Sequence, residues 1–268
     1  MTQAEKAELL RLLHRGPSIL RIANVWDAAS ARIVERAGFP AVATGSAGIS
    51  FSLGYRDGEA IPLEEMLGQV RRIARVIAVP LTADLEAGYD DIERTAAGLV
   101  DAGAMGLNLE DFKAGVLLEV PAQAARIQAV RRTGARLGVP IVINARTDIY
   151  LEQIGDPATR FDRTVERLLA YREAGADCGF VPAVRDEETI ARLVEALRFP
   201  LNILASASTP SAARLQALGV ARVSVGSAPM RATMGLMRRI AEEIRDAGTY
   251  AAMLDGAVSY DEANELMG

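Results

Sequence analysis

Short apolar runs recur along the chain, and most of them follow a helical stretch that ends in Ala-Gly or Leu-Gly. The glycine stands where the end of a helix needs a residue in the left-handed conformation. Most of the runs are apolar on both faces, which is typical of parallel strands covered by helices. Eight such runs are found, at residues 18–23, 41–44, 81–84, 105–109, 141–144, 178–181, 201–204 and 221–225.

Amphipathic stretches separate most of these runs and predict helices between them. Eight alternating units in 268 residues predict an α/β protein with a (β/α)8 (TIM) barrel fold. The alternative is an open, doubly wound sheet, but Asn24-Val25-Trp26-Asp27 stands where that fold would carry Gly-x-Gly-x-x-Gly. The expected helices lie at 63–78, 91–102, 121–137, 162–174 and 187–197.

Both ends of the chain extend beyond the eight units. Residues 1–16 predict an N-terminal helix, and residues 228–268 predict a C-terminal helical extension with apolar positions such as Met234 and Met237. An apolar helix beyond the eighth unit must pack either on the base of its own barrel or on a neighbouring subunit. No linker or shift of composition marks a second domain, so we expect a single barrel domain over residues 1–268.

Composition narrows the class of protein. The chain is 50% hydrophobic with a formal net charge of −5, which argues against nucleic acid as the main partner. The single cysteine, Cys178, excludes an intramolecular disulfide, and the single histidine, His14, makes a His-rich metal site or a Ser-His-Asp triad improbable. No apolar run approaches the length of a membrane span, and the first residues resemble a helix rather than a secretory leader. We therefore expect a cytoplasmic protein without a membrane partner.

Acidic residues follow the third and fourth apolar runs, and a cation follows the fifth. Because active sites of barrels form at the carboxyl ends of the strands, Asp84 and Glu110 are expected to converge there with Arg146 beside them. Oxygen ligands without His or Cys suit Mg²⁺ or Mn²⁺ rather than Zn²⁺. The alternative is that Arg146 pairs with Glu110 or Asp84 in an ion network without a metal.

The segment Thr44-Gly45-Ser46-Ala47-Gly48 is expected to form a loop of small residues after the second strand. Its backbone N–H groups could hold a carboxylate or a developing oxyanion, although a tight turn is the commoner use of such a segment. Ser46 without a histidine is a poor candidate for a nucleophile.

These motifs, taken together, resemble the isocitrate lyase / phosphoenolpyruvate mutase superfamily over about residues 13–226. The resemblance implies a barrel, a Mg²⁺ site, and 2-oxo or 2-hydroxy acid substrates whose C–C or P–C bonds are broken or rearranged, often through an enolate held on the metal. It also implies subunits that exchange a C-terminal helix within a tetramer. The segments that carry the resemblance are Asn24–Ala31, Thr44–Gly48, Gly54–Asp57, Ala83–Asp84, Leu109–Asp111 and Asn144–Asp148.

The resemblance assigns a role to each matching residue. Asp84 corresponds to the central metal ligand of the family, and Asp57, Glu86 and Glu110 correspond to its outer, often water-bridged carboxylates. Arg146 corresponds to the arginine that contacts the substrate. The other residues that correspond to substrate contacts of the family are Thr44, Gly45, Ser46, Ala47 and Asn202.

Three departures from the family pattern are visible. The chain has Asp84-Leu85-Glu86 where the family usually shows Asp-x-Asp, so the second acid is one methylene longer. It lacks the Lys-Lys-Cys-Gly-His loop of isocitrate and methylisocitrate lyases after the fourth strand, and Pro182 stands where phosphonate mutases carry a histidine. Cleavage of isocitrate itself is therefore disfavoured.

The function we expect is that of a Mg²⁺-dependent lyase or hydrolase that acts on a C–C bond of a small 2-oxo or 2-hydroxy acid through a metal-stabilised enolate. Arg146 would hold developing charge, and Asp57 or Glu86 would handle protons. One alternative is a mutase or hydrolase of the P–C bond of a phosphonate such as phosphonopyruvate. Another is a barrel that binds a carboxylate without turnover. The resemblance further implies a homo-oligomer, either a dimer or a tetramer.

Overall fold

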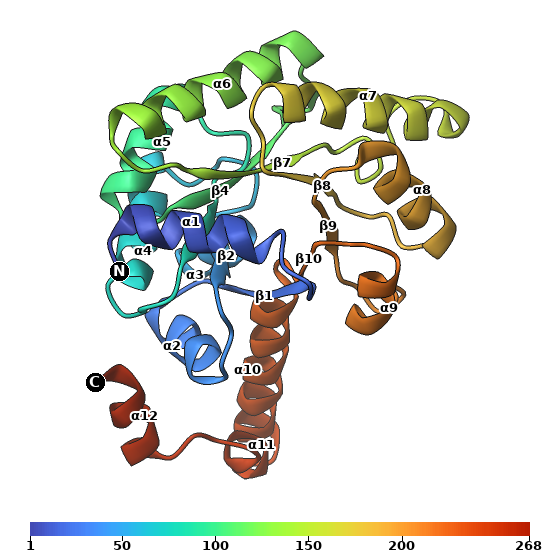
Figure 1. Ribbon diagram of the computed structural model, residues 1–268. Coiled ribbons are helices and arrows are strands. Elements are labelled where there is room, and N and C mark those ends of the chain that lie inside the picture. Colours follow the sequence, from blue (N-terminus) through green and yellow to red (C-terminus); the bar gives the residue numbers. More distant parts are fainter.

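Eight parallel strands close into a barrel in the computed structural model, which describes residues 1–268 (Figure 1). The order around the barrel is β1-β10-β9-β8-β7-β4-β3-β2, so each strand pairs with its neighbours in the order of the chain. This confirms the predicted (β/α)8 barrel. The strands are β1 (Leu20–Val25), β2 (Val42–Thr44), β3 (Leu81–Asp84), β4 (Gly106–Glu110), β7 (Val142–Arg146), β8 (Cys178–Val181), β9 (Leu201–Leu204) and β10 (Arg222–Ser224).

Helices surround the barrel and bury their apolar faces against the strands in one core of 48 buried residues. Side-chain caps start several of them: Asp91 accepts from two backbone amides of α5, and Asp186 accepts from the Thr189 amide of α8. The surrounding helices are α2 (Ala28–Arg36), α3 (Ser46–Ser52), α4 (Leu63–Ala74), α5 (Ile92–Asp101), α6 (Val120–Arg136), α7 (Arg160–Glu173), α8 (Glu187–Leu197) and α9 (Ala212–Ala217), with a 3-10 turn at Pro157–Thr159.

Two segments differ from the prediction, and both lie at the carboxyl ends of the strands. The expected loop at Thr44–Gly48 is wrong from Ser46 onward, because α3 begins there, with Gly45 as its N-cap. A small antiparallel hairpin, β5 (Phe112–Lys113) and β6 (Val116–Leu117), follows β4. Ala114 and Gly115 both have positive φ angles, as a two-residue hairpin turn requires.

The N-terminal helix α1 (Gln3–Leu13) lies across the amino ends of the strands and closes that end of the barrel. Leu10 is fully buried, and Arg11 donates to the Pro140 carbonyl and to Asp177, both of which precede strands. His14 ends this helix and is buried. The carboxyl ends of the strands, where the sequence predicts the functional site, lie at the opposite end of the barrel.

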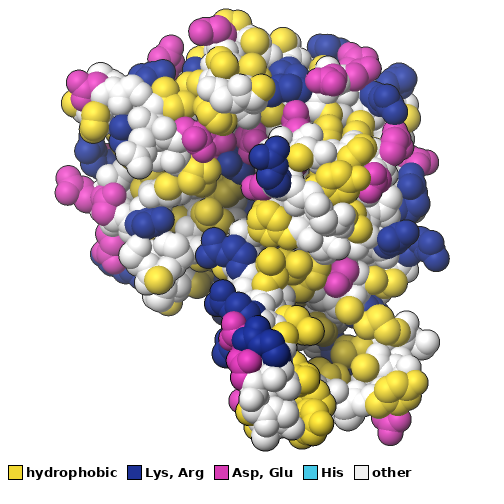
Figure 2. All heavy atoms as spheres, turned by 180° about the vertical axis from the view of Figure 1, so that it is seen from behind, with side chains coloured by type: hydrophobic (Ala, Val, Ile, Leu, Met, Phe, Trp, Pro, Cys, Tyr) yellow, Lys and Arg dark blue, Asp and Glu magenta, His cyan; other side chains and the backbone are white.

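The C-terminal extension forms α10 (Ala228–Asp246), α11 (Ala251–Leu254) and α12 (Tyr260–Met267). Figure 1 shows α10 projecting away from the barrel and α12 returning toward α2, where Arg32 Nε donates to the Leu266 carbonyl at 2.5 Å. Large apolar side chains stay exposed on this extension, as Figure 2 shows, among them Met234, Met237 and Leu254. No helix of the chain has both the length and the apolar character needed to cross a bilayer.

Candidate active site

A pocket of about 200 Å³ opens at the carboxyl ends of the strands. Six of the residues predicted for the site line it: Gly45, Ser46, Ala47, Asp57, Asp84 and Arg146. The other four, Thr44, Glu86, Glu110 and Asn202, lie beside or beneath the lining. The pocket is further lined by Asn24, Asn108, Leu151, Phe180, Pro182, Leu204, Ser224 and Ser227.

Asp84 ends β3 and is held by groups from β2 and α3. Its Oδ2 atom accepts a hydrogen bond from Ser46 Oγ at 3.0 Å and from the Ser46 amide at 3.3 Å. The Asp84 amide donates to Thr44 Oγ1 at 2.9 Å. Ser46 and Thr44 therefore orient Asp84, while Oδ1 of Asp84 takes no part in these bonds.

Arg146 ends β7 and is clamped between two carboxylates. Its Nη1 lies 2.7 Å from Glu110 Oε2, and its Nε lies 2.6 Å from Asp148 Oδ1. Burial lowers the pKa of Arg146, but the charges of Glu110 and Asp148 more than offset it, so the guanidinium stays protonated. Arg146 therefore forms the ion pair with Glu110 that was considered as an alternative to a metal site. A metal-binding role of Glu110 stays a prediction.

Asp57 and Glu86 are the acids best suited to carry protons. Burial and the charge of Asp84 raise the pKa of Asp57 above its ordinary range. Burial, opposed by a hydrogen bond from the Glu59 amide, raises the pKa of Glu86 to about 7. Glu86 is almost fully buried at φ 54°, and its Oε1 has no partner, so it is strained and incompletely satisfied. Such residues cluster at functional sites.

The loops around these acids are tied together by Lys113 of the hairpin. Its Nζ lies 3.2 Å from Glu59 Oε2 and donates to the Tyr89 carbonyl at 2.6 Å. Glu59 in turn accepts from the Tyr89 amide at 2.6 Å. The segment that carries Asp57 is thereby fixed to the loop after β3 and to the hairpin after β4.

The acids fit a hydrated divalent cation better than a dry cluster of ligands. No group of three or more His, Cys, Asp or Glu side chains converges closely enough to ligate an ion directly. Mg²⁺, however, keeps several waters and often takes only one or two protein carboxylates. Asp84 and Asp57 line the same pocket, and the orphan oxygen of Glu86 is an available acceptor for a bound water.

Some pocket residues were not predicted as site residues. Asn24 Oδ1 accepts from the amides of Val225 and Gly226 at 3.0 and 2.8 Å, so it links the first strand to the last at the rim of the pocket. Asn108 donates nothing to the pocket acids but accepts from Asn144 Nδ2 at 2.8 Å. The sequence signal that could have identified Asn24 and Asn108 is their position as polar residues at or near the ends of apolar runs.

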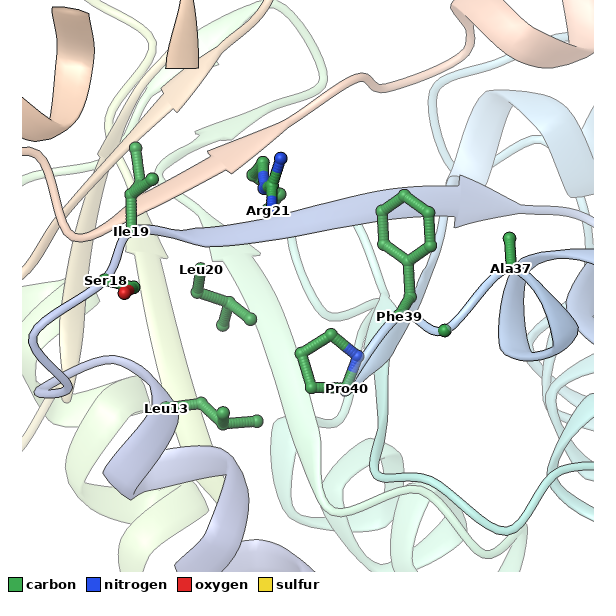
Figure 3. A pocket seen from close by; sticks show the side chains of 9 residues that line it. Leu13, Ser18, Ile19, Leu20, Arg21, Ala37, Phe39 and Pro40 are labelled. Carbon is green, nitrogen blue, oxygen red and sulfur yellow. The ribbon is translucent and has the colours of Figure 1, made fainter. Parts of the chain in front are cut away.

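A larger cavity lies at the opposite end of the barrel. It measures about 390 Å³ and is bounded by the starts of β1 and β2, with Leu13, Phe39 and Pro40 around it (Figure 3). Arg21 is the one charged residue in its lining, and no acid lies there. Of these two pockets, only the smaller one has acids in its lining, and it lies at the carboxyl ends of the strands, so it is the candidate active site.

The chain is similar to known proteins over most of its length. The family model described as phosphoenolpyruvate phosphomutase matches residues 9–245. The chain belongs to this family. Oxaloacetate decarboxylase of Rhodopseudomonas palustris (strain TIE-1) is 33% identical over 209 residues, which cover 75% of this chain and 71% of that protein.

Solved structures agree at the level of the whole fold. A candidate lyase or mutase from Burkholderia cenocepacia J2315 has a TM-score of 0.90 at 36% identity, covering 98% of this chain and 96% of that one. Oxaloacetate acetylhydrolase, solved with the inhibitor 3,3-difluorooxalacetate, has a TM-score of 0.87 at 27% identity, covering 98% and 93%. The relatives place this chain among the carbon–carbon lyases of the phosphoenolpyruvate mutase / isocitrate lyase superfamily.

Proposed function

We propose that this enzyme is a Mg²⁺-dependent lyase that cleaves a C–C bond of oxaloacetate or of a closely related small 2-oxo acid. The observation that carries the proposal is the pairing, in one pocket of about 200 Å³, of an oriented carboxylate, Asp84, with a permanently charged Arg146. A pocket of this size suits a substrate of a few carbon atoms. The names of the similar proteins favour oxaloacetate among such acids.

Arg146 would bind a carboxylate of the substrate. Its Nε and Nη1 face Asp148 and Glu110, which fix the plane of the guanidinium and leave Nη2 outside both ion pairs. A guanidinium held in this way is preorganised to stabilise negative charge that develops during the reaction. The first turn of α3 would orient the second carboxylate through the Ala47 amide, because the Gly45 amide donates to the Val25 carbonyl and the Ser46 amide donates to Asp84.

Proton transfer is assigned to Asp57, with Glu86 behind it. Decarboxylation of oxaloacetate breaks the bond between C3 and the departing carboxylate, and the electron pair is delocalised into the C2 carbonyl. The product pyruvate then needs one proton at C3. Asp57 lines the pocket, and burial and the charge of Asp84 raise its pKa, so we assign it to the delivery of that proton.

A metal ion completes the proposed site. When bound, Mg²⁺ or Mn²⁺ supplies the positive charge that lowers the energy of an enolate. Asp84 is the residue we assign as its direct ligand, with Asp57, Glu86 and Glu110 acting through water. Asn202 was predicted as a substrate contact, but it lies below the lining and hydrogen-bonds Ser224 at 3.2 Å, so we assign it to support of the floor.

Phosphonate chemistry is the second candidate, because the matching family model is that of phosphoenolpyruvate phosphomutase. The residue at the end of β8 argues against it. Pro182 lines the pocket there and offers no proton donor or cation to a transferring phosphoryl group.

The test is a product assay by proton NMR with oxaloacetate and Mg²⁺, beside a phosphate-release assay with phosphonopyruvate. We expect pyruvate from oxaloacetate at a rate well above that of Mg²⁺ alone. Oxalate and acetate would instead indicate hydrolysis of the same substrate. Phosphate release without turnover of oxaloacetate would refute the proposal in favour of P–C chemistry. The exposed variant Asp255→Asn serves as the control for the active-site variant Asp84→Asn.

We further propose that α10 to α12 pack on a second copy of this chain. Exposed apolar side chains line the extension, among them Met234, Met237, Leu254, Val258 and Tyr260 (Figure 2). Contiguous apolar surface of this kind usually marks an interface. Light scattering should give a dimer or tetramer for the wild type and a smaller species for Met237→Glu. A monomeric wild type would exclude this interface. The expected cytoplasmic location stays a prediction.

A further inference from the structure

A buried arginine of strand β10, Arg222, has no part in the roles described above. Arg222 begins β10, is 1% exposed, and is the largest fully buried side chain of the protein. Its nearest polar contacts are long: Nη1 lies 3.4 Å from His14 Nε2, and Nη2 lies 3.5 Å from Asn108 Oδ1. Its Nε has no partner, and no ion pair of the structure includes it. A buried charge in this state is costly, so it calls for an explanation.

His14 does not supply a counter-charge. Its Nδ1 lies 2.7 Å from the Leu10 carbonyl, which can only accept, so Nδ1 carries the proton. Nε2 is then the lone-pair acceptor that faces Arg222, and the ring is neutral. Burial and the charge of Arg222 lower the pKa of His14 to about 4, which agrees with this tautomer. The base of the barrel therefore solvates the guanidinium weakly without neutralising it.

The guanidinium reaches upward to the floor of the acid pocket. Asn108, which contacts Nη2, lines the pocket and is the register partner of Asp84 on the neighbouring strand. Side chains of register partners in parallel strands lie on the same face. Burial lowers the pKa of Arg222, and Asp84 is among the groups whose charge opposes this effect and favours the protonated form. The positive charge thus lies one layer below the carboxylates.

The two arginines near the pocket differ in their charge balance. Arg146 is matched by two carboxylates, whereas Arg222 has none in contact. An anionic substrate entering among Asp57, Asp84 and Glu86 meets a negative field that paired Arg146 cannot cancel by itself. Charges in a low-dielectric interior act over longer distances than in water.

We propose that Arg222 is the internal counter-charge of the acid pocket, a positioning residue that acts through Asn108 and through space to make the site accept an anion. The choice of Mn²⁺ and oxalate as ligands rests on the proposed function. The stability test does not depend on that function. The proposed role predicts that Arg222 lowers the folding stability of the protein, because functional sites often contain residues that are unfavourable for packing.

The first experiment measures cation and anion binding separately. Arg222→Met removes the charge and roughly preserves the shape, and Ile22→Val on the adjacent strand is the control for packing alone. We expect Arg222→Met to bind Mn²⁺ at least threefold more tightly and oxalate, at saturating Mn²⁺, at least tenfold more weakly. Opposite shifts require a change of charge. Loss of both affinities, or no change in either, would overturn the proposal.

The second experiment needs no ligand. We expect the melting temperature of Arg222→Met to equal or exceed that of the wild type, and the gain to be larger in the Asp84→Asn background, where the buried cation loses its negative partner. A lower melting temperature, or the same change in both backgrounds, would mean that Arg222 is only structural. Failure of the product assay with oxaloacetate would refute the proposed function without affecting this result.

Discussion

Arg146 offers the sharpest quantitative test of the site. Replacing it by Met leaves Glu110 and Asp148 without their cation, although their side chains are only 14% and 1% exposed. Breaking a buried ion pair by removal of one partner typically costs about 3–5 kcal/mol. For a chain of this length that corresponds to a drop of roughly 6–20 °C in the melting temperature.

The cost should depend on pH in a defined direction. Burial already raises the pKa of Glu110 and of Asp148 in the folded wild type, against the opposing charge of Arg146, and loss of that charge should raise both pKa values further above those of the unfolded chain. The folded variant then binds more protons than the unfolded chain, so its stability falls as pH rises from the unfolded pKa through the folded one. The difference between wild type and variant is therefore expected to be larger at pH 8 than at pH 5.

The assay is thermal unfolding at both pH values, with Arg214→Met as the matched control. Arg214 also pairs with a glutamate, Glu187, but that pair is half exposed and contributes little. An Arg146→Met variant as stable as Arg214→Met, or one whose deficit does not grow with pH, would contradict the assigned ion-pair network. If it folds, its kcat/KM should also fall by about a hundredfold or more, as on loss of a charge-stabilising donor.

Two further predictions follow from single residues. Burial raises the pKa of Glu86 to about 7 from an ordinary value near 4.5, so the metal-free wild type should lose stability relative to Glu86→Gln as pH rises between these values. The test is the melting temperature of both proteins in EDTA across this pH range, and the same pH dependence for both would refute the prediction. Gly88 has φ 84°, and an added Cβ would lie 2.6 Å from Ile92 Cδ1 and 2.9 Å from Leu109 Cδ1, so Gly88→Ala should cost about 2–4 kcal/mol. Gly115→Ala has a similar φ but open space and should cost about 1 kcal/mol; equal costs in urea unfolding would show that crowding is not the cause.

The barrel was predictable because its signals are local and repeated. Most units carry a helix, a glycine at the helix end and an apolar strand, and the eight apolar runs support one another. Segments without such a repeat were less predictable. The first turn of α3 contains Ser46 and Gly48, whose weak helix propensity favours a loop, and packing of Ile49 in the core overrides that preference.

The site was predictable in its composition but not in its contacts. Strand ends identified Asp84 and Arg146 because the carboxyl ends of barrel strands meet, whereas Asp57 was assigned only through the family resemblance. Which acid Arg146 contacts depends on side-chain orientation across β4 and β7, which a sequence does not specify. Arg222 was missed for the same reason, since a charged residue in a three-residue strand gives no sign that its side chain points inward.

The central claim is that the acid pocket holds a divalent ion which, with Arg146, binds a 2-oxo acid. Calorimetric titration of oxalate, a small dianion with the oxygen pattern of such an acid, tests it most directly. The wild type should bind oxalate only when Mg²⁺ is present, and Asp84→Asn should not bind it under either condition. Equal binding with and without Mg²⁺, or unchanged binding by Asp84→Asn, would contradict the account.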